Sequence, residues 1–243
     1  MIFGAILAGG SGTRMSAHNI PKQFIEICGK PIIIHTLEVM LKLKEFDYIY
    51  IAIHPNYKKY LLDILEKFNL KNNHKIVIVN GGKERIDSIQ NVINGLLEKS
   101  NNPEDVVVLH DAVRPFVTEK IFKDSVASAS KNGVCVAVVP AVDTMYVLNE
   151  NGQLVGMPPR QTLFNGQAPD SFKVKILKDS LDRLDESERA TLTGTVQICS
   201  VKGYPVSTIQ GSYQNIKITT ENDLIVAKAI FEKRKHESLC INK

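Results

Sequence analysis

The stretch IFGAILAGGSGTRM, residues 2–15, carries the two signals that decide the fold. Its first half, residues 2–7, is apolar and uncharged, which is typical of a buried strand. Three glycines then fall within four positions, at Gly9, Gly10 and Gly12. A glycine turn directly after a strand lets the backbone approach a ligand closely, and its N–H groups can bind phosphate. The stretch therefore predicts an α/β fold with an anion site beyond its first strand.

This turn fits neither of the two widespread glycine motifs. The dinucleotide fingerprint G-x-G-x-x-G would need a glycine at Met15, and the P-loop pattern G-x-x-x-x-G-K-[ST] does not occur. A tight turn without a ligand would account for one glycine better than for three. We therefore expect a phosphate-binding turn of another kind.

Apolar and amphipathic segments alternate along the chain. The expected strands are residues 2–7, 48–53, 76–79, 106–109 and 134–139, and the expected helices are residues 31–44, 57–68, 87–99, 173–184 and 221–235. Strand, helix, strand repetition at this spacing predicts parallel strands joined by right-handed crossovers. The predicted fold is a doubly wound, mostly parallel α/β sheet of the Rossmann-like type, whose ligands bind beyond the carboxyl ends of the strands.

The pattern changes after Pro140. Residues 143–148 and 153–156 are extended runs that flank Asn149-Glu150-Asn151-Gly152, and Asn-Gly between such runs is a strong hairpin signal. We expect a β-arm at about residues 141–166 that projects from the sheet. Because an isolated hairpin is marginally stable in water, this arm predicts a second subunit against which it packs.

Composition argues against several classes of protein. The chain has 243 residues, 44% of them hydrophobic, so it can bury a core, but no stretch approaches the roughly 18 apolar residues of a membrane span. Its start lacks the pattern of a signal peptide, and we expect a soluble, cytoplasmic protein. A net charge of +4, 7% aromatic residues and no tryptophan argue against nucleic-acid binding. Four cysteines without C-x-x-C spacing predict neither a zinc site nor a disulfide framework.

Charged residues follow two of the predicted strands. Arg14 and Lys22 lie near the first glycine turn, where they could clamp a polyphosphate, and the alternative is that they are ordinary surface cations. Asp111 and Arg114 follow the strand at residues 106–109, in the sequence HDAVRPF. There the alternatives are an ion pair between the two side chains and contact with a ligand.

A second glycine turn, Asn80-Gly81-Gly82-Lys83-Glu84-Arg85, follows the strand at residues 76–79. It leads into a helix that we expect to begin near Asp87 and Ser88. A helix N-terminus favours anions, so this turn predicts a second ligand contact. Ser88 could cap the helix, contact the ligand, or do both.

Seven short motifs occur in order along the chain: LAGGxGTRM, PKQF, GGxxRxxS, HDAVRPF, DT, QxPxxF and NIKITT. Together they resemble the cytidylyltransferases that make CDP-alcohols, a family that includes the methylerythritol 4-phosphate enzymes of isoprenoid synthesis and the ribitol 5-phosphate enzymes of teichoic-acid and capsule synthesis. The resemblance runs from residue 2 to about residue 229. It implies a single nucleotidyltransferase domain over residues 1–243, CTP and a polyol phosphate as substrates, Mg²⁺ bound mainly through the CTP phosphates, and a homodimer.

The resemblance also assigns roles to particular residues. Those implied for CTP are Leu7, Ala8, Gly9, Gly10, Ser11, Gly12, Gly81, Gly82, Lys83, Glu84, Arg85, Asp87, Ser88 and Asp111, the last also as a metal ligand. Those implied for catalysis are Arg14, Lys22, Arg160 and Lys217, and those implied for the acceptor are Arg114, Thr144, Arg160, Thr193 and Lys217. In relatives the counterpart of Arg160 comes from the partner subunit.

The residue types suit the reaction that the resemblance implies. A phosphate oxygen of the acceptor attacks the α-phosphorus of CTP in line, and pyrophosphate leaves as the CDP-alditol forms. The attacking oxygen is already anionic, so the step needs neither a general base nor a covalent residue, and the chain offers no convincing Ser-His-Asp or Cys-His set. Repulsion between two anions is the obstacle, so cations should provide most of the catalysis.

Small departures from the family pattern bear on the acceptor. Methylerythritol enzymes carry Q-T-P-Q where this chain has Gln167-Ala168-Pro169-Asp170, and Thr-Asp where it has Thr193-Gly194. Residues 6–10 and 21–24 look more like the ribitol branch, so we expect D-ribitol 5-phosphate as the acceptor. The alternatives are methylerythritol 4-phosphate, another alditol or sugar phosphate, a uridylyl- or guanylyl-sugar pyrophosphorylase, and a non-catalytic nucleotide-binding relative. Retention of the implied catalytic cations argues against the last.

Overall fold

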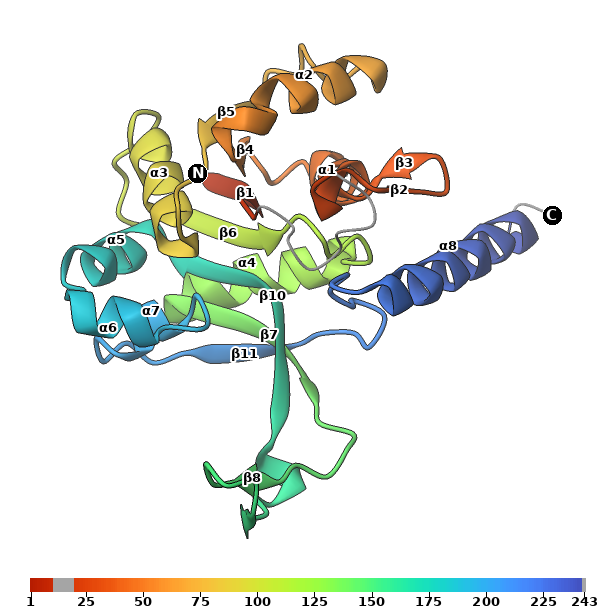
Figure 1. Ribbon diagram of the computed structural model, residues 1–243. Helices are drawn as coiled ribbons and strands as arrows, with labels where there is room; N and C mark the ends of the chain where they lie inside the picture. Colours follow the sequence, from red (N-terminus) through yellow and green to blue (C-terminus); the bar gives the residue numbers. More distant parts are fainter. Residues whose placement is uncertain (11–19, 242–243) are drawn as a thin grey trace.

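A seven-stranded sheet forms the centre of the computed structural model, which describes residues 1–10 and 20–241 (Figure 1). In spatial order its strands are β11 (Ser207–Gln210), β7 (Val134–Pro140), β10 (Phe164–Lys173), β6 (Val106–Asp111), β1 (Ile2–Ala8), β4 (Tyr48–Ile53) and β5 (Ile76–Asn80). Neighbouring strands are parallel except at β10, which runs antiparallel to both β6 and β7. The predicted doubly wound, mostly parallel α/β sheet is confirmed.

Two strands of this sheet, β10 and β11, are not predicted from the sequence. The sequence of β10 contains a glycine, a proline and an aspartate, which are rare in strand interiors. Its register with β7 shifts between Gly166 and Asp170, so a bulge takes the proline out of the hydrogen-bonded ladder. The strand forms in spite of its composition because it pairs on both of its edges.

Helices cover both faces of the sheet. One face is covered by α1 (Ile32–Lys42), α2 (Lys58–Lys67) and α4 (Glu119–Asn132), and the other by α3 (Arg85–Leu97), α5 (Val174–Asp182) and α7 (Gln197–Ser200). Alternate residues of β4 enter the two layers, Ile51 on the first and Tyr50 on the second, and both are fully buried. Each such side chain stabilises the fold by roughly 1.5–3 kcal/mol. The five predicted helices are confirmed. The helix α4 is not predicted, because its sequence consists largely of polar and small residues.

The last helix, α8 (Glu221–Ile241), packs through Leu224 and Ala227 beside Phe116 and then extends away from the sheet (Figure 1). The remaining short elements are η2 (Lys22–Phe24), β2 (Glu26–Ile27), β3 (Lys30–Pro31), η3 (Pro55–Tyr57), α6 (Glu186–Thr191) and η4 (Arg160–Thr162). Within the part of the chain that the structure describes, no helix is both long and apolar enough to span a bilayer.

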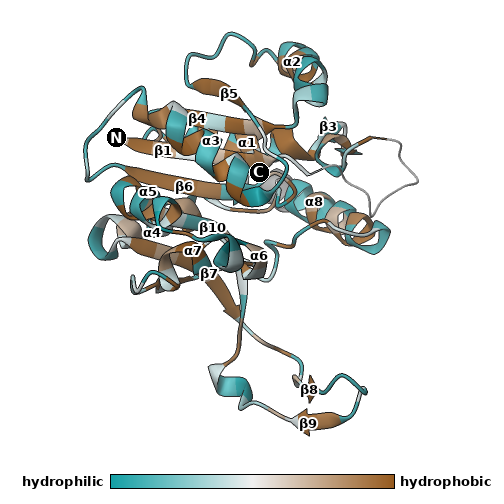
Figure 2. Ribbon diagram, turned by 60° about the vertical axis from the view of Figure 1, so that its left-hand side comes forward, coloured by the Kyte–Doolittle hydropathy of each residue, from teal (hydrophilic) through white to brown (hydrophobic). Residues whose placement is uncertain are grey.

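A hairpin arm projects from the sheet between β7 and β10 (Figure 1). Its tip holds β8 (Val147–Leu148) and β9 (Leu154–Gly156), which are shorter than the predicted runs. The predicted turn is present: the Asn149 amide donates to Gln153 O at 2.9 Å, and Gly152 has a φ of +75°. Figure 2 shows apolar residues along the arm, and eight of them are 48–63% exposed: Val142, Met145, Tyr146, Val147, Leu148, Leu154, Val155 and Met157.

The order of the strands determines where a ligand can bind. The chain runs from β1 to β4 and β5 on one side of the sheet and then returns to β6 on the other side of β1. The direction of winding therefore reverses between β1 and β6, and ligands of doubly wound sheets bind beyond the carboxyl ends of the strands at such a point. Residues that follow β1 and β6 are thus the first place to look for a site.

Candidate functional site

The two glycine turns meet beyond the carboxyl ends of β1 and β5. A Cβ atom added to Gly81 would lie 3.2 Å from the Cα atom of Gly9, and one added to Gly9 would lie 3.0 Å from Ser88 Oγ. The Gly81 amide also donates to Ile53 O at 2.7 Å, which ties the second turn to the end of β4. Only glycine allows the two backbones to approach this closely.

The second turn is shaped by the start of α3. This helix begins at Arg85 and is capped by Glu84 through a capping box, in which the Glu84 amide donates to Asp87 Oδ2 at 3.0 Å. Of the alternatives for Ser88, capping of the helix is excluded, because Glu84 occupies the N-cap position. The buried Ser88 hydroxyl instead accepts from the Gly82 amide at 3.0 Å and donates to Glu84 O at 3.2 Å. Ser88 thus holds the turn in shape from inside.

A hollow of about 200 Å³, here called the glycine hollow, opens between the two turns. It is lined by Leu7, Gly9, Gly10, Gly82, Lys83, Glu84, Arg85 and Ser88. The structure therefore brings together eight of the residues that the sequence assigned to CTP. Of the others, Ser11 and Gly12 lie outside the described residues, as does Arg14. Asp87 serves the capping box rather than the lining.

The motif PKQF has a structural explanation at the same edge of the sheet. The side chain of Gln23 is buried, and its Nε2 donates to Ala8 O at 2.8 Å, at the end of β1. This hydrogen bond fixes η2 beside the first glycine turn. Lys22 is the first residue of η2, so its backbone is held near the end of β1 by the neighbouring Gln23, and a contact of its ammonium group with a ligand stays a prediction.

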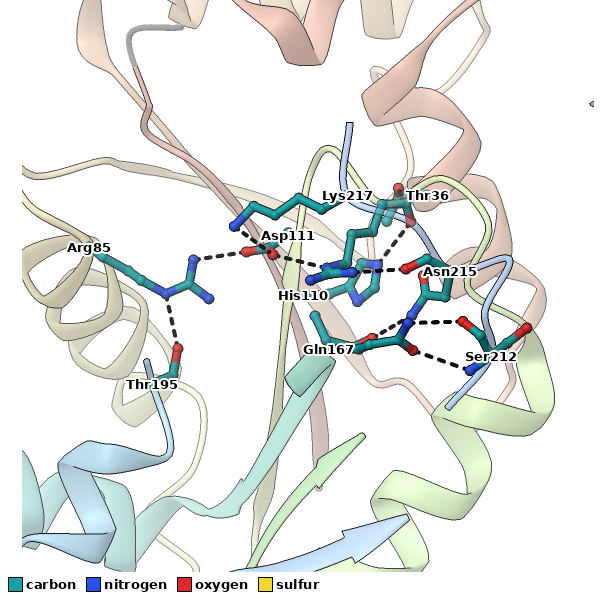
Figure 3. A network of polar contacts seen from close by, with 11 residues as sticks. Thr36, Arg85, His110, Asp111, Gln167, Thr195, Ser212, Asn215 and Lys217 are labelled. Atoms are coloured by element: carbon teal, nitrogen blue, oxygen red, sulfur yellow. Dashed lines mark hydrogen bonds and ion pairs between the residues drawn. The ribbon is translucent and has the colours of Figure 1, made fainter. Parts of the chain in front are cut away.

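A buried carboxylate surrounded by three cations lies beside the glycine hollow (Figure 3). Asp111, at the end of β6, is 7% exposed. Its Oδ1 is 2.8 Å from Arg85 Nη1, and its Oδ2 is 3.2 Å from both Arg114 Nε and Lys217 Nζ. Burial alone would raise the pKa of Asp111, but Arg85, Lys217 and Arg114 outweigh burial and hold that pKa well below its usual range. Asp111 is therefore a permanent anion that orders three cations.

The predicted ion pair between Asp111 and Arg114 is thus present as one part of a larger network. The Arg114 side chain is nearly buried, and its Nη1 also donates to Asn215 O at 2.8 Å. His110 Nε2 lies 3.1 Å from Arg114 O, and burial lowers the pKa of His110 to about 4. His110, beside the carboxylate, is therefore neutral near pH 7. Arg114 connects the end of β6 to the loop before α8 through its bond to Asn215.

A clamp from β10 positions the loop that carries Lys217 (Figure 3). Gln167 Nε2 donates to Ser212 O at 2.9 Å, and the Ser212 amide donates back to Gln167 Oε1 at 3.2 Å. Asn215 is fully buried, and its Nδ2 donates to Ala168 O at 2.7 Å. The bulge of β10 frees these residues from the sheet ladder so that they can make these bonds.

A second hollow, here called the Asp111 hollow, has a volume of about 260 Å³. It is lined by Arg85, Asp111, Arg114, Val136, Gly166, Gln167, Ala168, Asp170, Thr193, Gly194, Thr195, Val196 and Lys217. Arg85 lines both hollows, so the two adjoin at this residue. Five residues predicted from the sequence meet here: Arg85, Asp111, Arg114, Thr193 and Lys217.

Asp170 is a site residue that the sequence does not identify. It departs from the family pattern, is 7% exposed and lines the Asp111 hollow. Burial raises the pKa of Asp170 to about 7, and the negative charge of Asp111 adds to this, against the opposing effects of Arg85, Thr195 and Arg114. The signal that could have found it is a carboxylate inside a stretch that otherwise reads as strand.

Two predicted residues lie on the arm instead. Thr144 is exposed, and Arg160 begins η4, where its Nη1 donates to Val142 O at 3.3 Å. Within the described part of this chain, neither of them lines the glycine hollow or the Asp111 hollow. A role for them in the site of a partner subunit remains a prediction.

Comparisons with known proteins identify the family. Residues 2–233 match the family described as IspD, 2-C-methyl-D-erythritol 4-phosphate cytidylyltransferase. A relative from Lactiplantibacillus plantarum, named ribitol-5-phosphate cytidylyltransferase, is 40% identical over 235 residues, which are 96% of this chain and all of that protein.

Solved structures of two proteins are similar over nearly their whole length. The 4-diphosphocytidyl-2C-methyl-D-erythritol synthase of Anaerococcus prevotii is 27% identical, with a TM-score of 0.78 and coverage of 96% of each chain. The 2-C-methyl-D-erythritol 4-phosphate cytidylyltransferase of Francisella tularensis is also 27% identical, with a TM-score of 0.76 and coverage of 93% of this chain and 97% of its own.

Proposed function

We infer the reaction from the premise that this chain belongs to the IspD cytidylyltransferase family and is a nucleotidyltransferase. It transfers the cytidylyl group of CTP to D-ribitol 5-phosphate, and the products are CDP-ribitol and pyrophosphate. The name of the Lactiplantibacillus plantarum relative supports ribitol 5-phosphate as the acceptor. The observation that carries the proposal is the arrangement of two adjoining hollows around the cations that Asp111 orders.

Each hollow suits one of the two substrates. The glycine hollow has three glycines in its lining and lies at the N-terminus of α3, which favours a nucleotide. The Asp111 hollow has three cations against one ionised carboxylate, and Lys217 remains 45% exposed. This surplus of positive charge favours the phosphate of the acceptor. The shared Arg85 keeps the substrates adjacent.

The transfer needs positioning and charge rather than proton movement. An oxygen of the acceptor phosphate forms a bond to the α-phosphorus of CTP, and the bond from that phosphorus to the oxygen bridging to the β-phosphorus breaks. Asp111 stays ionised throughout, so it holds Arg85 and Lys217 in place without exchanging a proton. Lys22 and Arg14 supply charge to the reacting phosphates as the family resemblance implies. Each well-placed cation should contribute about 10²- to 10³-fold to the rate.

Magnesium belongs with the nucleotide in this proposal. Among the described residues there is no group of three or more His, Cys, Asp or Glu side chains placed to hold a metal ion. Both oxygens of Asp111 are engaged by cationic side chains, so this donor set does not fit a resident Mg²⁺ ion. We therefore write the substrate as MgCTP and assign no metal ligand in the chain.

The arm is proposed to complete the site in a homodimer. Its exposed apolar side chains need cover, and a second copy of the chain would provide it. Arg160 and Thr144 would then reach the acceptor in the partner's Asp111 hollow. We place the reaction in the cytoplasm, where CTP is available, and the product in the synthesis of teichoic acid or capsule.

A substrate panel tests the reaction directly. Release of pyrophosphate is measured with MgCTP and each of ribitol 5-phosphate, methylerythritol 4-phosphate and other polyol phosphates. We expect kcat/KM to be highest for ribitol 5-phosphate. A clear preference for methylerythritol 4-phosphate, the substrate in the family's description, would overturn the acceptor, and activity with UTP or GTP but not CTP would overturn the nucleotide.

A further inference from the structure

The Asp111 hollow contains a second buried carboxyl group, Asp170, whose surroundings differ from those of Asp111. Asp170 lies on β10, opposite Leu109 of β6 and Val136 of β7, on the side of the sheet that α5 and α7 cover. Residues of a strand alternate between faces, so it shares this side with the core residue Phe172 and points toward the residues before α7. It is 7% exposed and lines the hollow.

Asp170 has no cation of its own within the described residues. Its carboxyl group interacts with the hydroxyl of Thr195, and Thr195 Oγ1 accepts from Arg85 Nε at 3.0 Å. Arg85 reaches Asp111 directly but Asp170 only through this hydroxyl. A threonine hydroxyl donates one hydrogen bond, so a carboxyl group with two oxygens keeps capacity for another polar group.

A substrate that fills the hollow must complete the hydrogen bonds of this carboxyl group. A buried polar group that lacks partners destabilises the fold, and a buried charge does so more strongly. The phosphate of the acceptor belongs with the cations Lys217 and Arg85 of the same hollow rather than with this carboxyl group. What remains of a polyol phosphate is its row of hydroxyl groups.

We propose that Asp170 is a specificity-determining residue whose carboxyl group hydrogen-bonds one hydroxyl of the acceptor carbon chain. This rests on the proposed function, and it extends that function by naming what distinguishes acceptors: a hydroxyl is accepted at this position and a methyl group or a hydrogen atom is rejected. A site built to hydrogen-bond a substrate hydroxyl discriminates strongly against analogues that lack it, because the buried group is then left unpaired. Ala168 and Gly194, which line the same hollow, add no polar side-chain atom there.

The test compares substrates and variants in one cycle. Ribitol 5-phosphate and its four singly deoxygenated analogues are assayed with the full-length wild-type protein, Asp170→Leu and Asp170→Asn. For the wild type we expect one analogue to lose about 10- to 100-fold in kcat/KM. For Asp170→Leu, kcat/KM with ribitol 5-phosphate should fall by a similar factor. Removing the same hydroxyl from the substrate should then lower its kcat/KM by less than about threefold. The KM for MgCTP should change less than about twofold.

The two possible failures are distinguishable. If the wild type is inactive with MgCTP and ribitol 5-phosphate, the proposed function fails and the inference fails with it. If the wild type is active but every deoxy analogue keeps its full penalty in Asp170→Leu, only the inference is overturned. Asp170→Asn keeps the shape of the side chain and can still hydrogen-bond a hydroxyl, so we expect it to keep most of the discrimination that Asp170→Leu loses. Equal loss of discrimination in the two variants would also overturn the inference. Asp182→Asn, which removes an exposed carboxylate on α5 outside both hollows, is the matched control.

Discussion

The glycine hollow and the Asp111 hollow adjoin at Arg85 but are built in opposite ways. Two turns that each follow a strand directly form the first, and their glycines lie close together. The second is assembled from residues of α3, β6, β7 and β10, from the segment at residues 193–196, and from Arg114 and Lys217. The first should therefore be sensitive to added atoms and the second to removed charges.

The largest effect is expected where a charge is removed from the Asp111 hollow. Lys217→Ala should lower kcat/KM for the acceptor by about 10²- to 10³-fold, because it removes the more exposed of the cations on Asp111 Oδ2. Steady-state kinetics with varied ribitol 5-phosphate measure this, and the KM for MgCTP should stay within about twofold. Lys217→Arg keeps the charge and should recover part of the loss. An equal loss in both variants would mean that the ammonium charge is not what matters.

Adding one methyl group should damage the glycine hollow almost as much. The Cβ atom of Gly82→Ala would lie 2.0 Å from Asp87 Cβ, so the turn or the capping box must move. Misplacement of a reacting group by about 1 Å can cost about 10²-fold in rate, and we expect a loss of that order in kcat/KM for MgCTP.

Gly10→Ala is the matched comparison for Gly82→Ala. Among residues 1–10 and 20–241, nothing lies within 4 Å of the position of its added methyl group, although Gly10 lines the same hollow. We expect the thermal stability of Gly10→Ala to equal that of the wild type while Gly82→Ala melts at a lower temperature. Equal melting temperatures for all three proteins would contradict the steric argument.

The same difference explains what could be predicted from the sequence. The turns of the glycine hollow are local, so Gly9, Gly10 and the second turn could be identified from spacing alone, together with the strands that precede them. The Asp111 hollow depends on pairs far apart in sequence, such as Asn215 with Ala168 and Arg85 with Thr195. No local pattern encodes those contacts. The resemblance to a family supplied Lys217 and Thr193, but Asp170 and the clamp became visible only when β10 was seen to enter the sheet between β6 and β7.

The two carboxylates of the Asp111 hollow should differ in how they affect stability with pH. The pKa of folded Asp170 is about 7, above its unfolded value, so between these values the unfolded chain ionises while the folded protein keeps the proton. Stability therefore falls as pH rises toward 7 and changes no further above it. Asp111 stays ionised in the folded state across this range and adds no slope above pH 5.

Asp170→Asn removes that slope. Relative to the wild type, its free energy of unfolding should rise by roughly 2 kcal/mol between pH 5 and pH 7 and then stay level to pH 8, since one pKa unit corresponds to about 1.4 kcal/mol. Urea denaturation at pH 5, 6, 7 and 8 measures the difference. A difference that does not change with pH would show that the folded protein does not hold this proton.

The smallest effect is expected from a residue that touches neither substrate. Asn215 is fully buried and makes two hydrogen bonds that hold the Lys217 loop. Its side-chain Nδ2 donates to Ala168 O of β10, and its backbone carbonyl accepts from Arg114 Nη1. Asn215→Ala removes only the first of these bonds, so Lys217 should be displaced slightly rather than released. We expect about a tenfold loss in kcat/KM for ribitol 5-phosphate, mainly through KM, with the KM for MgCTP unchanged. The control is Gln210→Ala, an exposed position at the end of β11. If Asn215→Ala raised the KM for MgCTP as much as the KM for ribitol 5-phosphate, the Lys217 loop would support both hollows. The two hollows would then not bind their substrates independently.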